Sequence, residues 1–271
     1  MLLSLTTGIL AHVERSSYWP NPAPDKSVEP APGGKVPKAR SLESALRSKS
    51  RGDTYVVCKS DSLSRAKRSI SRAQKSGWSL RPTVAAEKLS KKAAKQLLKI
   101  NKQLAKRCDF RHIQAAVNEA NNNDRVVVMP GEYLEEPSRK QPTNDPKCKR
   151  YEERSERGAG AATYRYQVKC PNDQSLIYIQ GRALTKKKVP FPPLADRSGI
   201  PDQGKCIKCN LQIEGSGVSS DDVVIDLAKN AKGTKLRGPA KPAMDVGFRA
   251  DRADGVVIRN VTVAHAAEHG I

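Results

Sequence analysis

The chain has 271 residues and a formal net charge of +21 at pH 7, so it attracts polyanions such as nucleic acids, acidic polysaccharides and anionic membrane surfaces. Hydrophobic residues make up 37% of it and aromatic residues 4%, with 18 glycines and 18 prolines, which excludes a chain that is globular throughout. No apolar run approaches the roughly 20 residues that a membrane-spanning helix needs, so the sequence predicts no membrane span.

Residues 1–52 consist of an apolar start and a Pro-rich stretch. The segment from Met1 to Ala11 resembles the apolar part of a signal peptide, but it lacks a basic n-region and a clear cleavage motif. A signal remnant and an ordinary N-terminus therefore both stay open. Residues 17–52 are crowded with Pro, Ser, Gly and Lys and show no hydrophobic period, which predicts a disordered linker.

Residues 53–109 are predicted to form a basic helical hairpin. The first helix follows Asp61 as its N-cap and stops at Gly77, and the second follows Pro82. Apolar residues recur at helical spacing in both segments: Leu63, Ala66, Ile70 and Ala73 in the first, and Ala85, Leu89, Ala93, Leu97, Ile100 and Leu104 in the second.

The other faces of this hairpin are strongly basic, because Lys and Arg greatly outnumber acidic residues over 59–107. Such a surface indicates binding of nucleic acid or of another acidic polymer. The alternative is an accessory hairpin whose solvated faces are basic. The alternative is favoured, because Trp78 is the only aromatic residue near enough to stack on a base.

The six cysteines, an even number in a loop-rich chain, favour an oxidising compartment and hence an extracellular or cell-surface location. A zinc half-site would need a second CxxC motif and a redox motif would need a βαβ setting, and the sequence offers neither. Three disulfides are predicted: Cys58 with Cys108 around the hairpin, Cys148 with Cys170 around an insertion, and Cys206 with Cys209 within a CxxC motif.

Residues 110–271 repeat a short strand that alternates inward and outward and then turns. A short helix from Phe110 to Ala120 precedes strands near 126–133, 177–181, 211–215, 223–226, 246–249 and 256–260. Units too small to bury their own faces predict a solenoid. The predicted fold class is therefore all-β, an incomplete right-handed parallel β-helix with an N-terminal capping helix. A sandwich is disfavoured because Asp254-Gly255 is the only hairpin-type dipeptide near a strand.

Three stretches carry a resemblance to a known family: FRHIQAAVNEANNNDRVVVMPGEYLEEPS, CNLQIEGSGVSSDDVVID and FRADRADGVVIRNVTV. They resemble the entry and early coils of pectate-lyase-like right-handed parallel β-helix repeat proteins, over residues 108–271. The resemblance implies that the chain holds only the N-terminal portion of such a helix. It decides no activity, because the superfamily includes polysaccharide lyases, hydrolases, epimerases and modules without known chemistry.

A uronide lyase of this kind needs a cation, often Ca²⁺, to neutralise the sugar acid and a basic residue to take the proton. The candidates are Asp251, Arg252 and Asp254, with Asp245, Arg249 and the outward Arg259 nearby. The favoured alternative is that these aspartates form turns and these arginines are solvated.

A histidine pair near the C-terminus, His265 and His269 with Glu268 between them, has the spacing of a zinc pair on a helix. The segment is predicted to be a turn and no third ligand is evident, so no metal is assigned. No cofactor is evident from the residues, and Ca²⁺ enters only through the resemblance.

The sequence therefore predicts a secreted β-helix protein that interacts with acidic polysaccharide and to which no catalysis can be assigned. One alternative is a polysaccharide lyase or hydrolase that acts on acidic glycans, although this chain alone is expected to be inactive. The other is nucleic-acid binding by the basic hairpin, which would show as an affinity that falls steeply with salt. The sequence predicts neither the substrate nor the oligomeric state.

Overall fold

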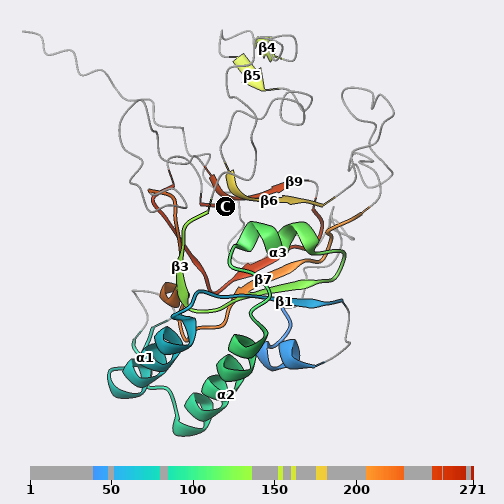
Figure 1. Ribbon diagram of the computed structural model, residues 1–271. Coiled ribbons are helices and arrows are strands. Elements are labelled where there is room, and N and C mark those ends of the chain that lie inside the picture. The colour runs from blue at the N-terminus through green and yellow to red at the C-terminus, as the bar shows by residue number, and fades with distance from the viewer. Residues whose placement is uncertain are drawn as a thin grey trace, which may run out of the picture.

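The computed structural model describes residues 39–47, 52–79, 85–135, 152–154, 160–162, 175–181, 206–228, 246–251, 253–266 and 270–271. Its elements in chain order (Figure 1) are η1 (Leu42–Leu46), β1 (Thr54–Val57), α1 (Ser62–Lys75), α2 (Lys91–Arg107), α3 (Ile113–Glu119), β2 (Arg125–Val128), β3 (Gly131–Tyr133), β4 (Glu152–Arg154), β5 (Gly160–Ala162), β6 (Ser175–Gln180), β7 (Gln212–Gly215), η3 (Ser220–Asp222), β8 (Val223–Asp226), β9 (Val246–Asp251), β10 (Val257–Arg259) and β11 (Thr262–Ala264). None of the described helices has the length and apolar character to cross a membrane.

The largest sheet has four parallel strands in the order β1-β2-β7-β10. Val126 of β2 lies beside Ile213 of β7, which lies beside Ile258 of β10. The other described sheets are a parallel one in the order β11-β8-β3, a parallel pair β6-β9 and an antiparallel pair β4-β5.

Strand β2 is buried on both faces, and its alternate residues enter two separate hydrophobic clusters. Val126 and Val128 join the larger cluster, which α3 and strand residues such as Ile177, Ile213 and Ile225 complete. Val127 and Met129 join the smaller one with Ala45 of η1, Val56 of β1, and Ile100 and Leu104 of α2. The sheet therefore lies between α3 on one side and α2 with η1 on the other.

The predicted all-β class, and with it the right-handed parallel β-helix, is wrong. The described chain is a mixed α/β structure with three α-helices and several short parallel sheets. The predicted strands do exist, because alternation followed by a turn is a local property of the sequence. Alternation does not say which distant strands will pair, and here they divide among several short sheets.

Three local predictions also need correction. The second helix begins at Lys91, where the Ser90 hydroxyl accepts the Ala93 N–H at 3.2 Å, and not directly after Pro82. Strand β1, which was not predicted, pairs with β2, so segments assigned to two different domains share one sheet. Part of the predicted disordered linker is the 3-10 helix η1, which packs in the smaller cluster.

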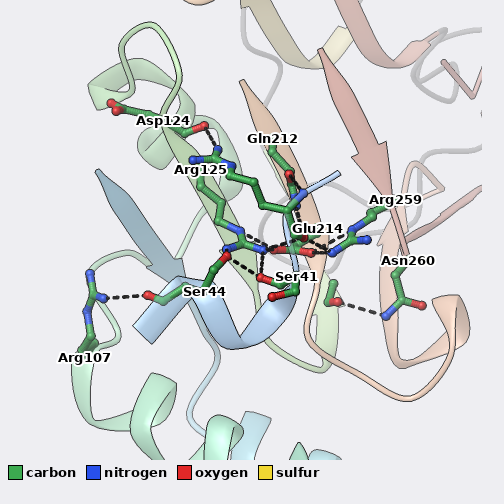
Figure 2. A network of polar contacts seen from close by, with 12 residues as sticks. Ser41, Ser44, Arg107, Asp124, Arg125, Gln212, Glu214, Arg259 and Asn260 are labelled. Carbon is green, nitrogen blue, oxygen red and sulfur yellow. Dashed lines mark hydrogen bonds and ion pairs between the residues drawn. The ribbon is translucent and has the colours of Figure 1, made fainter. Parts of the chain in front are cut away.

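A buried carboxylate joins the large sheet to the N-terminal segment (Figure 2). Glu214 of β7 is ion-paired with Arg125 of β2 and accepts from Nε of Arg259 of β10 at 2.9 Å. Arg125 is 1% exposed, and it also donates to the carbonyl oxygen of Ser41 at 2.7 Å and to the hydroxyl of Ser44 at 2.9 Å. Burial lowers the pKa of Arg125, and Glu214 opposes that shift.

Removal of this carboxylate should be strongly destabilising. In Glu214→Ala the guanidinium of Arg125 stays buried without its anionic partner, so we expect the free energy of unfolding to fall by about 3–5 kcal/mol. The control is Asp61→Ala, which breaks the exposed Asp61–Arg65 pair and should cost less than about 1 kcal/mol. Urea unfolding measures both, and equal losses would contradict a structural role for Glu214.

Candidate functional site

Helices α1 and α2 form a hairpin (Figure 1). A disulfide closes the hairpin at its base. Cys58 precedes α1 and Cys108 is the C-cap of α2, and their Cα atoms are 5.5 Å apart, the pairing that the sequence predicted. At the other end, Trp78 and Glu87 exchange backbone hydrogen bonds of 2.9 and 2.8 Å. The hairpin is thus fixed at both ends.

One face of α2 carries all of its lysines, and we call these six residues the basic face of α2: Lys91, Lys92, Lys95, Lys99, Lys102 and Lys106. At 3.6 residues per turn they fall within a sector of about 100° and extend for about 22 Å along the helix. All six are exposed. The opposite face contributes Ile100 and Leu104 to the smaller cluster, so packing of the helix turns its lysines outward.

The described acidic residues do not neutralise the basic face of α2. Over 59–107 the sequence has fifteen Lys and Arg residues and only two acids, Asp61 and Glu87. On α1, Arg65 pairs with Asp61 at 2.6 Å and Arg72 lies 3.7 Å from Asp222. In the part of the chain that the structure describes, no carboxylate lies within ion-pair distance of the six lysines of α2.

A groove of about 560 Å³ lies along the C-terminal half of this face. It is lined by Leu63 of α1 and by Lys99, Lys102, Gln103, Ala105 and Lys106 of α2. Leu63, Ala105 and the aliphatic stems of the lysines supply apolar surface, while the ammonium groups stay at the water boundary. The groove therefore suits a ligand that combines negative charge with an apolar ring face.

Of the residues that the sequence offered for catalysis, those whose side chains the structure describes do not line this groove. Asp251 ends β9, Arg252 lies outside the described residues, and Asp254 lies in the turn before β10. The side chain of Arg259 pairs with the buried carboxylate of Glu214. Arg249 pairs in register with Tyr178 on β6. The catalytic role of these residues stays a prediction, and the part of the chain that the structure describes adds no geometry that would support a lyase site.

The remaining cysteine and histidine predictions have mixed outcomes. Cys206 and Cys209 form the predicted disulfide, with Cα atoms 5.7 Å apart. Cys148 and Cys170 lie outside the described residues, as do Asp245, Glu268 and His269. The Nδ1 atom of His265 lies 2.8 Å from Oδ1 of Asp226, so this histidine has a carboxylate partner.

A buried acid that the sequence analysis missed caps α3. Glu135 is 1% exposed and accepts the N–H of Ile113 at 2.8 Å and that of Gln114 at 3.4 Å. His112, the N-cap residue, makes no side-chain capping bond, so Glu135 fills that role from 22 residues away. No local sequence signal marks such a long-range cap.

In the cluster around Glu135, the pKa values of Glu135 and Lys59 are shifted in opposite directions. Burial raises the pKa of Glu135, while the N–H of Ile113 and the nearby His112 oppose the shift. Burial lowers the pKa of Lys59, and Glu135 opposes that shift. Because both carboxylate oxygens of Glu135 accept backbone N–H groups, we assign the cluster to capping rather than to acid–base chemistry.

Comparison with protein-family models, with curated proteins and with solved structures finds no match to this chain. Its function therefore has to be inferred from the chemistry of its own surfaces.

The buried Glu135 predicts a pH dependence of stability. Because its pKa in the folded protein lies above the ordinary value of 4.5, the folded state holds this proton more tightly than the unfolded chain does. Its contribution to the free energy of unfolding is therefore fully present below pH 4.5 and is lost as the pH rises through the raised pKa. Urea unfolding of wild type and Glu135→Gln from pH 4 to 8 measures this, since the variant lacks the titration. A wild-type stability that rose relative to the variant would contradict it.

Proposed function

We propose that the basic face of α2 and its groove bind an acidic polysaccharide. The observation that carries this proposal is the alignment of six exposed lysines on one rigid helix without acidic partners among the described residues. From Lys92 to Lys106, successive charges lie about 5 Å apart along the helix, which suits a linear polymer that carries one anionic group on each sugar.

The composition of the hairpin favours a polysaccharide over a nucleic acid. Proteins that bind single-stranded nucleic acid stack bases on exposed aromatic side chains. Trp78 is the only aromatic residue over 59–107, and it is half-buried at the tip of the hairpin, where its backbone pairs with Glu87. The two disulfides are compatible with an extracellular protein, where acidic glycans are common ligands.

Binding rather than turnover is the activity that we propose. The groove offers cations and apolar surface, but the residues that line it include no carboxylate or histidine that could act as a general base. The lyase or hydrolase alternative rests on Asp251, Arg252 and Asp254, and Asp254, the one whose side chain the structure describes, does not line the groove. Acidic-polysaccharide binding needs only the surface that the described residues provide.

The double variant Lys99→Ala/Lys102→Ala tests the proposal. Both lysines line the groove, and each cation near an anionic surface contributes about 1 kcal/mol, so we expect affinity for polygalacturonate or a sulfated glycan to fall roughly 30-fold. The slope of log affinity against log salt should also become shallower by about two, because fewer counterions are released. Titration calorimetry at several salt concentrations measures both quantities.

The matched control is Arg68→Ala/Lys75→Ala, which removes the same charge from exposed positions of α1. These two residues lie more than about 100° around the helix from Leu63, the α1 residue in the groove. We expect the fold-loss of affinity in this control to be less than a third of the fold-loss in the α2 variant. Equal losses would show that net charge, and not the α2 face, drives binding, and tighter binding of duplex DNA than of either glycan would overturn the choice of ligand.

A further inference from the structure

Two segments far apart in the sequence bring three metal-ligating side chains together. The sulfur atoms of Cys206 and Cys209 and a carboxylate oxygen of Asp254 all lie within 4.8 Å of one another. Cys209 is 4% exposed, whereas Cys206 and Asp254 are half-exposed, so solvent reaches one side of the group. In the sequence alone the CxxC motif had no third ligand.

Hydrogen bonds that do not involve the sulfur atoms hold the CxxC loop. The side chain of Asn122 donates to the carbonyl oxygen of Cys206 at 2.9 Å and accepts the N–H of Cys209 at 2.8 Å. The N–H of Ile207 donates to the carbonyl oxygen of Gly181 at 2.7 Å. The backbone on both sides of the motif is therefore positioned independently of the disulfide, so breaking the disulfide would leave the two sulfurs as neighbours.

Asp254 is tied to the same loop by its backbone. The N–H of Asn210, the residue after Cys209, donates to the carbonyl oxygen of Asp254 at 2.7 Å. The next residue, Gly255, has a φ of +67°, and a Cβ there would lie 2.2 Å from Oδ1 of Asn210. Only glycine permits this close approach, which keeps the Asp254 turn against the CxxC loop.

The intervening lysine does not place its charge among the ligands. Lys208 donates from Nζ to the carbonyl oxygen of Asn118 at 2.8 Å and to that of Ala120. Its ammonium group is therefore bound at the end of α3. A cation at the sulfur atoms would then meet less repulsion from Lys208.

We propose that reduction of the Cys206–Cys209 disulfide converts this group into a Zn²⁺ site. A dithiol such as a thioredoxin-type protein or a small-molecule dithiol attacks one sulfur, leaves as a cyclic disulfide and transfers two electrons and two protons, which yields two cysteine thiols. Zn²⁺ then displaces the two thiol protons and binds two thiolates and one Asp254 oxygen, with water in the fourth position. Thiolates about 3.8 Å apart fit a tetrahedral zinc ion, so the two sulfur atoms have to move apart once their bond is broken, and Cα atoms 5.7 Å apart leave room for that spacing.

The inference goes beyond polysaccharide binding, and it is independent of α2. It assigns to this loop a second state that depends on the redox potential: a disulfide under oxidising conditions and a metal site under reducing ones. Because two of the ligands are thiolates, the site should prefer Zn²⁺ to Ca²⁺ or Mg²⁺, which bind oxygen ligands.

The test uses the full chain with Cys148→Ser/Cys170→Ser, so that those two thiols cannot contribute. The protein is reduced with dithiothreitol, freed of it by anaerobic gel filtration, and titrated with Co²⁺ as a spectroscopic probe and with Zn²⁺ in competition. We expect one equivalent of Co²⁺ to give a thiolate-to-metal charge-transfer band in the reduced protein and none in the oxidised protein.

Two variants separate this site from the other cysteine pair. Cys206→Ser/Cys209→Ser should abolish the band, and Cys58→Ser/Cys108→Ser should keep it. Asp254→Asn, which retains the size of the side chain, should weaken Zn²⁺ binding at least tenfold. Circular dichroism verifies that each variant is folded. The proposal is overturned if the reduced parent shows no band, if Cys206→Ser/Cys209→Ser keeps it, or if Asp254→Asn binds Zn²⁺ as tightly as the parent.

Discussion

The carboxylate of Glu214, buried between two guanidinium groups, is the interaction on which the arrangement of this protein depends. It lies in β7 and joins Arg125 of β2 to Arg259 of β10, so one ionic group spans three neighbouring strands. Arg125 also binds the chain at Ser41 and Ser44, which fixes η1 over this face of the sheet. A buried charge is tolerated only when its hydrogen-bonding capacity is filled, and the described contacts provide that.

Closure of this face by η1 and α2 determines what α2 presents to solvent. Ile100 and Leu104 pack against Val127 and Met129 in the smaller cluster, so the rotation of the helix about its axis is set by apolar burial. The lysines then have to point outward, and the Cys58–Cys108 disulfide holds the helix beside α1. A charged surface on a rigid support loses less conformational entropy on binding than the same charges on a free segment.

The two proposals concern different parts of the molecule. Ligand binding to the basic face of α2 is expected to depend on salt, whereas the state of the CxxC loop with Asp254 is expected to depend on reduction. Each depends on tertiary contacts for its geometry: α2 on the apolar cluster beneath it, and the CxxC loop on Asn122 and on the close approach of Gly255.

Local pattern was enough to predict much of this protein from its sequence. Apolar spacing of three and four residues gave α1 and the position of the basic face of α2, and alternation followed by turns gave β2, β7 and β10. The flanking positions of Cys58 and Cys108 gave their disulfide. Each of these features depends on neighbours a few residues apart or on a chain reversal between them, and such relations are visible in the order of the residues.

The tertiary structure decided everything that joins distant segments. The strands divide among several short sheets instead of one β-helix, β1 and η1 join the large sheet, and Glu135 caps a helix that begins 22 residues earlier. Arg259 was expected to be solvated and is bound to Glu214, and Asp254 meets a CxxC motif 45 residues before it. The spacing of apolar residues reports only on local structure, so it does not predict which distant strands pair. The partner of a charged side chain depends on which groups lose water together in the folded state, so it cannot be predicted from the order of the residues.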